Sequence, residues 1–130
     1  MPIRIVRLGS RRLPGEGLRL GTVRRPPRGV PKSQFAARDF YDVWVPDLAP
    51  SADVIASFQN TGRTDADWRR LERAYRSEMR QPERIRLCEL LAALSKTTSL
   101  SVGCYCEDER RCHRSILKEI LRDHGAEIAG

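Results

Sequence analysis

The positions of the prolines constrain the fold of this chain more than any other feature of its sequence. Seven of the eight prolines lie within the first 50 residues, and the eighth is Pro82. Proline breaks a helix and cannot donate a hydrogen bond within a central strand, so this first part can form only short elements. Apolar and basic residues alternate in IRIVRL (3–8) and, more weakly, in LRLGTVRR (18–25), which predicts two strands. A third short strand is expected at 43–45, where Pro46 ends it.

The chain after Pro50 has the periodicity of helices. Helices are predicted for ADVIASF, DADWRRLERAYRSEM and ERIRLCELLAALSK, at 52–58, 65–79 and 83–96. The second of them should bury one face, because apolar residues recur there at helical spacing: Trp68, Leu71, Tyr75 and Met79. TSLSVGCYC (98–106) then predicts a strand that leads into a last helix, RRCHRSILKEILRDHG (110–125), with Gly125 at its C-terminal cap.

Strands near both ends of the chain and helices between them indicate the α/β class. We expect residues 1–130 to form one compact domain, with a small, mainly parallel sheet flanked by helices, because 130 residues supply one hydrophobic core. Ligands of such sheets bind beyond the carboxyl ends of the strands. The end of the 18–25 strand, the end of the 43–45 strand and the cysteine-rich turn before the last helix are expected to meet there.

Basic residues are concentrated at the start of the chain. The net charge is +7, and residues 1–40 contain ten Lys or Arg residues against two acidic ones, whereas the rest contains fourteen against fifteen. A clustered basic region favours an anionic partner, such as a phosphorylated small molecule or a nucleic acid. The alternative is a charged face that contacts only solvent.

We expect neither a membrane span nor a secretion signal in this chain. No segment approaches the roughly 18 consecutive apolar residues of a membrane span, and arginines interrupt the N-terminal region where a signal peptide would be apolar. We therefore expect a cytoplasmic protein with no membrane partner, in which the four cysteines are reduced thiols.

Three of the four cysteines and one of the two histidines lie within ten residues of one another, in CYCEDERRCH (104–113). Cys104, Cys106, Cys112 and His113 have the donor atoms of a Cys3His zinc site. The spacing argues against zinc, since adjacent helical residues point about 100° apart and Cys-x-Cys is closer than the usual ligand pair. We therefore predict no metal and no cofactor, and this zinc set is the alternative.

Two other interpretations of this cluster concern anions. Cys104 and Arg110 have the spacing of a phosphatase-like loop, but the three carboxylates between them would repel a phosphate. The start of the last helix offers unpaired N–H groups, and His113 and Arg114 add donors there. Each residue alone is also explained by packing. Their expected proximity to Arg24 and Arg28, in the basic part of the chain, favours an anion site.

The chain resembles the small bacterial proteins of domain-of-unknown-function family 488, in the YeaO-like group. The matching segments occur in the family's order over almost the whole length: IRIVRL, VRRPPRGVPK, WVPDLAPS, WRRLERAYRSEM and CYCEDERRCHRSILKEIL. The resemblance implies a compact α/β domain without an established activity. It also marks the positions that match the family's motifs, which are Arg24, Arg28, Cys112, His113 and Arg114. Relatives often carry Glu where this chain has Cys106.

Together these observations predict a pocket that binds a phosphorylated or otherwise anionic ligand, such as a nucleotide or a nucleic acid end. Its expected ligand-binding residues are Arg24, Arg28, His113 and Arg114. Cys112 and His113 are the candidates for catalysis, although no pair of base and nucleophile is evident in the sequence. The alternative function is a structural or zinc-stabilised interaction module. We expect Arg114 to be exposed, so that removing it leaves the fold intact.

Overall fold

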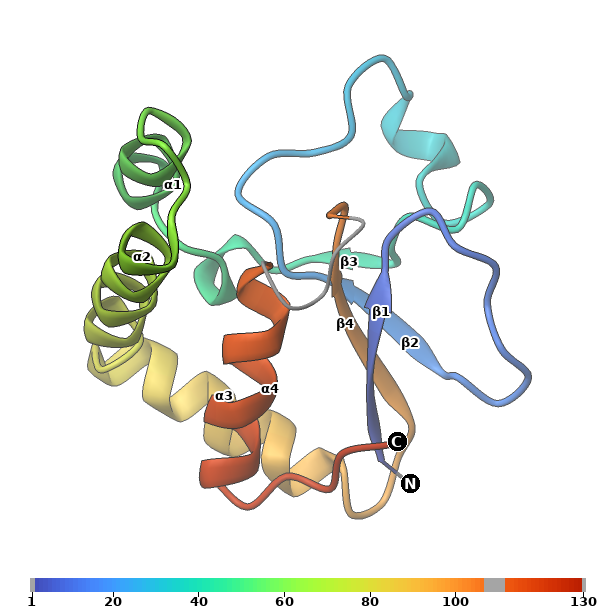
Figure 1. The fold of residues 1–130 in the computed structure, drawn as a ribbon. Helices are drawn as coiled ribbons and strands as arrows, with labels where there is room; N and C mark the ends of the chain where they lie inside the picture. Colours follow the sequence, from blue (N-terminus) through green and yellow to red (C-terminus); the bar gives the residue numbers. More distant parts are fainter. Residues whose placement is uncertain (1, 107–111, 130) are drawn as a thin grey trace.

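The computed structural model describes residues 2–106 and 112–129 and contains a four-stranded sheet. The strands are β1 (Ile3–Arg7), β2 (Leu18–Gly21), β3 (Val43–Trp44) and β4 (Leu100–Cys104). Their order is β1-β4-β2-β3, and every pairing is parallel (Figure 1). The predicted α/β class with a parallel sheet is therefore confirmed.

Four α-helices lie on one side of this sheet (Figure 1). They are α1 (Ala52–Gln59), α2 (Asp65–Glu78), α3 (Pro82–Leu94) and α4 (His113–Asp123), and short 3-10 turns occur at Lys32–Gln34 and Pro46–Leu48. Local signals begin two of them: the Ser51 hydroxyl accepts from the Val54 N–H, and Thr64 and Asp67 form a capping box. Within the described residues, no helix is long and apolar enough to cross a membrane.

The main hydrophobic core lies between the sheet and the helices. Apolar side chains of β1, β2 and β4 pack there against α2, α3 and α4, because alternate strand residues point to the same face. The face predicted for α2 is confirmed, since Leu71, Tyr75 and Met79 are buried and Trp68 packs against them. Tyr75 also places its hydroxyl group in this core, where it donates to the Leu48 carbonyl oxygen at 2.6 Å.

The other face of the sheet buries an ion pair. Arg19 of β2 is 0% exposed, and its Nε and Nη2 atoms donate to the Glu16 carboxylate at 3.0 and 2.8 Å. Its Nη1 atom donates to the carbonyl oxygens of Ser10 and Asp39. Ser101 of the central strand β4 donates to the same carboxylate at 2.7 Å. Polar contacts thus connect the segment before β2 to β4 on this face of the sheet, whereas the helical face is packed by apolar side chains.

This ion pair predicts a loss of stability in acid. Burial by itself raises the pKa of Glu16, but the hydrogen bonds from Ser101, Leu13 and Arg19 outweigh it and lower the pKa below its ordinary 4.5. A carboxyl group with a lowered pKa in the folded state stabilises the fold above its unfolded pKa, and this stabilisation disappears as the pH falls. The free energy of unfolding, measured with urea between pH 6 and pH 3, should therefore fall more steeply with decreasing pH for the parent than for Glu16→Gln. Equal slopes would contradict this assignment.

Candidate functional site

A cleft of about 550 Å³ lies at the carboxyl ends of β2 and β4, where ligands of parallel sheets are expected. Residues 23–25 and Arg28 follow β2, Cys104 to Cys106 end β4, and Cys112 and His113 begin α4. The opposite wall comes from α1 and the start of α2 and is largely apolar: Ala52, Ile55, Ala56, Phe58, Trp68 and Leu71. The cleft thus has a polar wall from the sheet edge and an apolar wall from the helices.

Four arginines line this cleft: Arg24, Arg25, Arg28 and Arg63. The described part of its lining contains no Asp or Glu side chain. Arg24 is fixed by the fold, since its Nε and Nη2 atoms donate to the carbonyl oxygens of Pro50 and Ala49, both at 3.1 Å. Arg25 and Arg28 are exposed. Arg63, between α1 and α2, is exposed as well. The cleft therefore combines one positioned guanidinium group with three exposed ones.

The backbone that carries these arginines is attached to the end of β4. The Tyr105 hydroxyl group donates to the Arg25 carbonyl oxygen at 3.1 Å, and the Trp44 indole N–H donates to the Val23 carbonyl oxygen at 2.8 Å. Two aromatic side chains from separate strand ends thus hold the segment after β2 against the sheet edge. This anchoring explains how a segment rich in proline and arginine keeps a defined place beside the cysteines.

His113 is the first residue of α4 and is held against the end of β2. Its Nε2 atom lies 2.6 Å from the Thr22 carbonyl oxygen, which can only accept, so Nε2 carries a proton. Burial lowers the pKa of the imidazole, and the hydrogen bond to Thr22 opposes this only in part. The ring also meets the edge of Tyr75. His113 therefore lines the cleft as a neutral ring near pH 7, and its Nε2–H group already donates to the Thr22 carbonyl oxygen.

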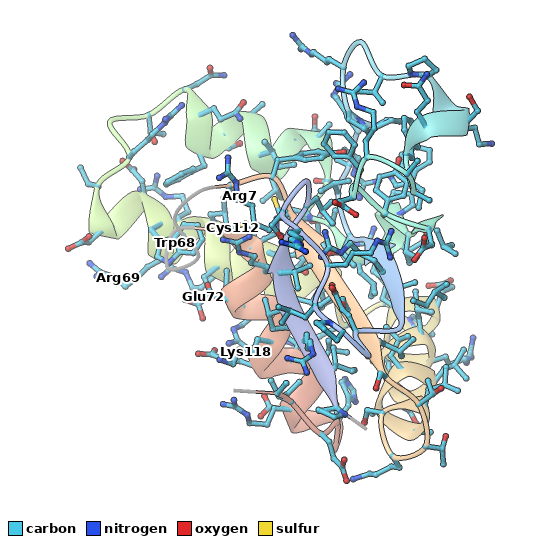
Figure 2. All side chains as sticks on the ribbon, turned by 90° about the vertical axis from the view of Figure 1, so that its right-hand side faces the viewer. Arg7, Trp68, Arg69, Glu72, Cys112 and Lys118 are labelled. Carbon is cyan, nitrogen blue, oxygen red and sulfur yellow. The ribbon has the colours of Figure 1, made fainter. Side chains whose placement is uncertain are left out.

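The three clustered cysteines meet at one corner of the cleft. Their Sγ atoms all lie within 4.8 Å of one another, and those of Cys104 and Cys106 are 3.6 Å apart. Cys104 and Cys112 are buried and pack with Leu8, and Figure 2 shows Cys112 where α4 begins. Cys106 is exposed. All four cysteines of the chain, including Cys88 in α3, are free.

The three thiols share their protons unequally. Hydrogen bonds from Cys104 and Cys112 lower the pKa of Cys106, and the positive charge of Arg114 acts in the same direction. The hydrogen bond to Cys106 in turn raises the pKa of Cys104 to about 11, and the pKa of Cys112 is raised by hydrogen bonds to both partners. The thiolate is the nucleophilic form of cysteine. Cys106, which the sequence did not single out for catalysis, is thus the thiol of the three whose pKa is lowered, and it is exposed, while Cys112 is buried.

Arg114 does not line the cleft, and the expectation that it is exposed is wrong. Its side chain is 5% exposed, and its Nη1 atom donates to the carbonyl oxygens of Val6 and Cys104 at 3.1 and 3.4 Å. These oxygens lie near the ends of β1 and β4, and Arg114 belongs to the first turn of α4. Arg114 therefore joins two strand ends to the helix, and a variant without it would perturb the fold.

The structure brings together most of the residues singled out from the sequence. Arg24, Arg28, His113 and the three cysteines line the same cleft. Arg110, the second residue of the phosphatase-like spacing, lies outside the described residues. Sequence reasoning missed Arg25 and Arg63, and it missed the contribution of α1. Arg25 could have been included, since it follows Arg24 directly, whereas nothing near Arg63 in the sequence connects it with this cleft.

Comparison with known proteins supplies a family but no characterised relative. A family model named DUF488-N3a, described as the active DUF488-N3 subclade, matches residues 3–125. The matched range includes every strand and every helix of the fold. Comparisons with curated proteins and with solved structures found no match.

Proposed function

The chain belongs to the DUF488 family, a domain of unknown function, and we propose that it binds a phosphorylated or otherwise anionic ligand, such as a nucleotide or the end of a nucleic acid. The observation that carries this proposal is the convergence of four arginines on one cleft whose described lining contains no carboxylate. Guanidinium groups bind phosphate oxygens through paired, charge-assisted hydrogen bonds. A wall that carries several of them attracts anions.

The two walls of the cleft favour a ligand with both a charged and an apolar part. Phe58 and Trp68 form an edge-to-face pair with ring centroids 5.6 Å apart on the helical wall of the cleft. A volume of about 550 Å³ falls within the range of ordinary small-molecule sites. A nucleoside phosphate has both parts, because its base can contact aromatic rings while its phosphate contacts arginine.

The residues have different roles in this proposal. Arg25 and Arg28 face solvent and are free to turn toward a phosphate, whereas Arg24 contributes a guanidinium group that the carbonyl oxygens of Ala49 and Pro50 already orient. His113 orients the start of α4 through Thr22. Because its pKa is lowered, we do not assign His113 a cationic role in binding.

We expect inorganic phosphate and AMP to raise the melting temperature of the protein, because a ligand that binds only the folded state stabilises it. At a concentration ten times the dissociation constant, this stabilisation is about 1.4 kcal/mol, which corresponds to a few degrees for a chain of this size. AMP should act at lower concentration than phosphate, and adenosine should act least. Arg28→Ala should lose more than half of the shift. The measurement is a thermal melt at constant ionic strength, adjusted with chloride.

The matched control is Arg122→Ala. Arg122 is an exposed arginine in the last turn of α4, away from the cleft, and its loss changes the net charge by the same amount. This variant should respond to phosphate and AMP as the parent does. If both variants respond equally, or if chloride reproduces the shift, the effect is one of general charge and the anion site does not exist. A structural module without a ligand predicts no shift in any of these proteins.

A further inference from the structure

We propose that Cys104, Cys106 and Cys112 form a metal site that holds one zinc ion through three thiolates. The three Sγ atoms lie within 4.8 Å of one another, and one pair is already 3.6 Å apart. Tetrahedral zinc with bonds of about 2.3 Å to sulfur separates its sulfur ligands by about 3.8 Å. Small rotations of the side chains therefore suffice to bring all three sulfurs onto one ion, and the backbone need not move.

The ligand set differs from the one that the sequence suggested. Two features of the sequence spoke against zinc: Cys112 and His113 point in different directions, and Cys-x-Cys is a short spacing. The Nε2 atom of His113 is indeed directed at the Thr22 carbonyl oxygen, but the Sγ atoms of Cys104 and Cys106 are 3.6 Å apart, so their short spacing does not keep them from sharing an ion. The direction of His113 does not matter for a set of three cysteines without the histidine. All three cysteines line the cleft, so water or a ligand atom can supply the fourth ligand, as at zinc sites that keep one position open.

The position of Cys112 is hard to explain by helix formation alone. Cys112 is the N-cap residue of α4, a position where Ser, Thr, Asp or Asn usually accept a backbone hydrogen bond. Its side chain makes no such capping bond. The sulfur is instead directed toward Cys104 and Cys106. Thiolates select soft or borderline ions such as zinc, so a sulfur at this position favours metal binding over capping.

The buried charge of Arg114 is a second, independent observation in favour of an anionic centre here. Arg114 is 5% exposed, its Nε atom has no hydrogen-bond partner within the part of the chain that the structure describes, and no ion pair of Arg114 occurs among those residues. A buried cation is strongly disfavoured unless a negative charge compensates it. Three thiolates around Zn²⁺ carry a net charge of −1, and Arg114 already contacts the Cys104 carbonyl oxygen. The zinc site would thus supply the missing counter-charge.

The test measures metal binding directly and does not depend on the anionic ligand. Protein purified under reducing conditions, stripped with a chelator and incubated with excess Zn²⁺ should retain one zinc per chain after desalting, by elemental analysis. Co²⁺ added to the stripped protein should produce the absorption of a tetrahedral cobalt site with sulfur-to-metal charge transfer. Zn²⁺ should also raise the melting temperature.

Cys106→Ala is the decisive variant, because Cys106 is exposed and its removal leaves the core unchanged. We expect it to weaken metal binding by at least about 100-fold, more than the loss of an outer-shell partner usually does. Cys88→Ala, which removes the one cysteine outside the cluster, should bind metal as the parent does once circular dichroism confirms its fold. Retention of no metal by the parent, or equal binding by parent and Cys106→Ala, would overturn the site. The phosphate response of Cys106→Ala should persist, which separates this inference from the proposed anion site.

Discussion

Glu16→Gln is expected to lower the free energy of unfolding by about 3–5 kcal/mol, the usual result of removing one partner from a buried ion pair. Every oxygen of the Glu16 carboxylate faces donors: Oε1 accepts from Arg19 and Ser101, and Oε2 accepts from Arg19 and Leu13. A glutamine side chain has nearly the same shape, but its NH2 group would replace one of the two oxygens. Its N–H donors would then face the donors that this oxygen accepts from in the parent. Arg19, which is 0% exposed, would then keep its charge without a counter-ion.

Urea unfolding near pH 7 measures this effect, and Glu72→Gln is the matched control. Glu72 pairs with Arg76 on the surface of α2, and both side chains are about one-third exposed. Solvent screens such a pair, so this identical chemical change should cost about 0.2–1 kcal/mol. If the two variants lose similar stability, the Glu16–Arg19 pair does not stabilise the face of the sheet away from the helices.

Gly103→Ala should lower the free energy of unfolding by about 3 kcal/mol, at the upper end of the usual effect of overpacking. Gly103 lies in β4, between β1 and β2, and a Cβ atom added there would approach the Val6 carbonyl oxygen to 2.6 Å. It would also lie 2.8 Å from Leu8 Cδ2. Because a carbonyl oxygen in a paired strand cannot turn away as a flexible side chain can, β1 and β4 would have to separate. That movement would also disturb Arg114, which donates to the same Val6 oxygen.

Gly62→Ala provides the comparison for this substitution. Gly62 lies between α1 and α2, and the nearest atom to an added Cβ is Thr64 Cγ2 at 3.8 Å. Its backbone conformation is one that alanine adopts without strain, so this variant should have the parent's stability or gain up to about 1 kcal/mol from the lower entropy of the unfolded chain. If Gly103→Ala and Gly62→Ala unfold at the same urea concentration, the sheet accommodates the added methyl group.

These substitutions distinguish residues that stabilise the fold from residues that line the cleft. Glu16 and Gly103 lie outside the cleft. Glu16 is on the side of the sheet away from the helices, and Gly103 is in β4, between β1 and β2. Arg28 and Cys106 line the cleft and are exposed. Changes at the first two residues should therefore lower stability, whereas changes at the other two should alter ligand or metal binding in a protein that remains folded.

The secondary structure and the α/β class followed from local patterns. The alternation in 3–8 and 18–25 predicted β1 and β2, and the spacing of Leu71, Tyr75 and Met79 predicted the buried face of α2. Such patterns succeed because a strand or helix exposes its side chains with a fixed period, whatever it packs against. The site was partly predictable for the same reason, since the carboxyl ends of parallel strands share one edge.

Charged residues were harder to place, because local sequence does not distinguish a buried charge from an exposed one. Arg114 and Arg122 are both arginines of α4, yet the first is buried under two strand ends and the second is exposed. Glu16 occurs in a glycine-rich turn that is typical of surface loops. Its burial depends on Arg19 and on Ser101, which is 85 residues away in the sequence.

The sequence by itself determined which segments are strands and helices, where prolines end them, and that cysteines, histidine and arginines lie at the segment ends. The tertiary structure alone decided that β4 enters between β1 and β2. That insertion places the sulfurs of Cys104 and Cys106 beside that of Cys112, turns Arg114 inward to two strand carbonyls, and sets His113 against Thr22. The physical reason is that strand order is fixed by the burial of apolar faces over the whole chain, whereas the period of a strand or helix is a property of its own backbone.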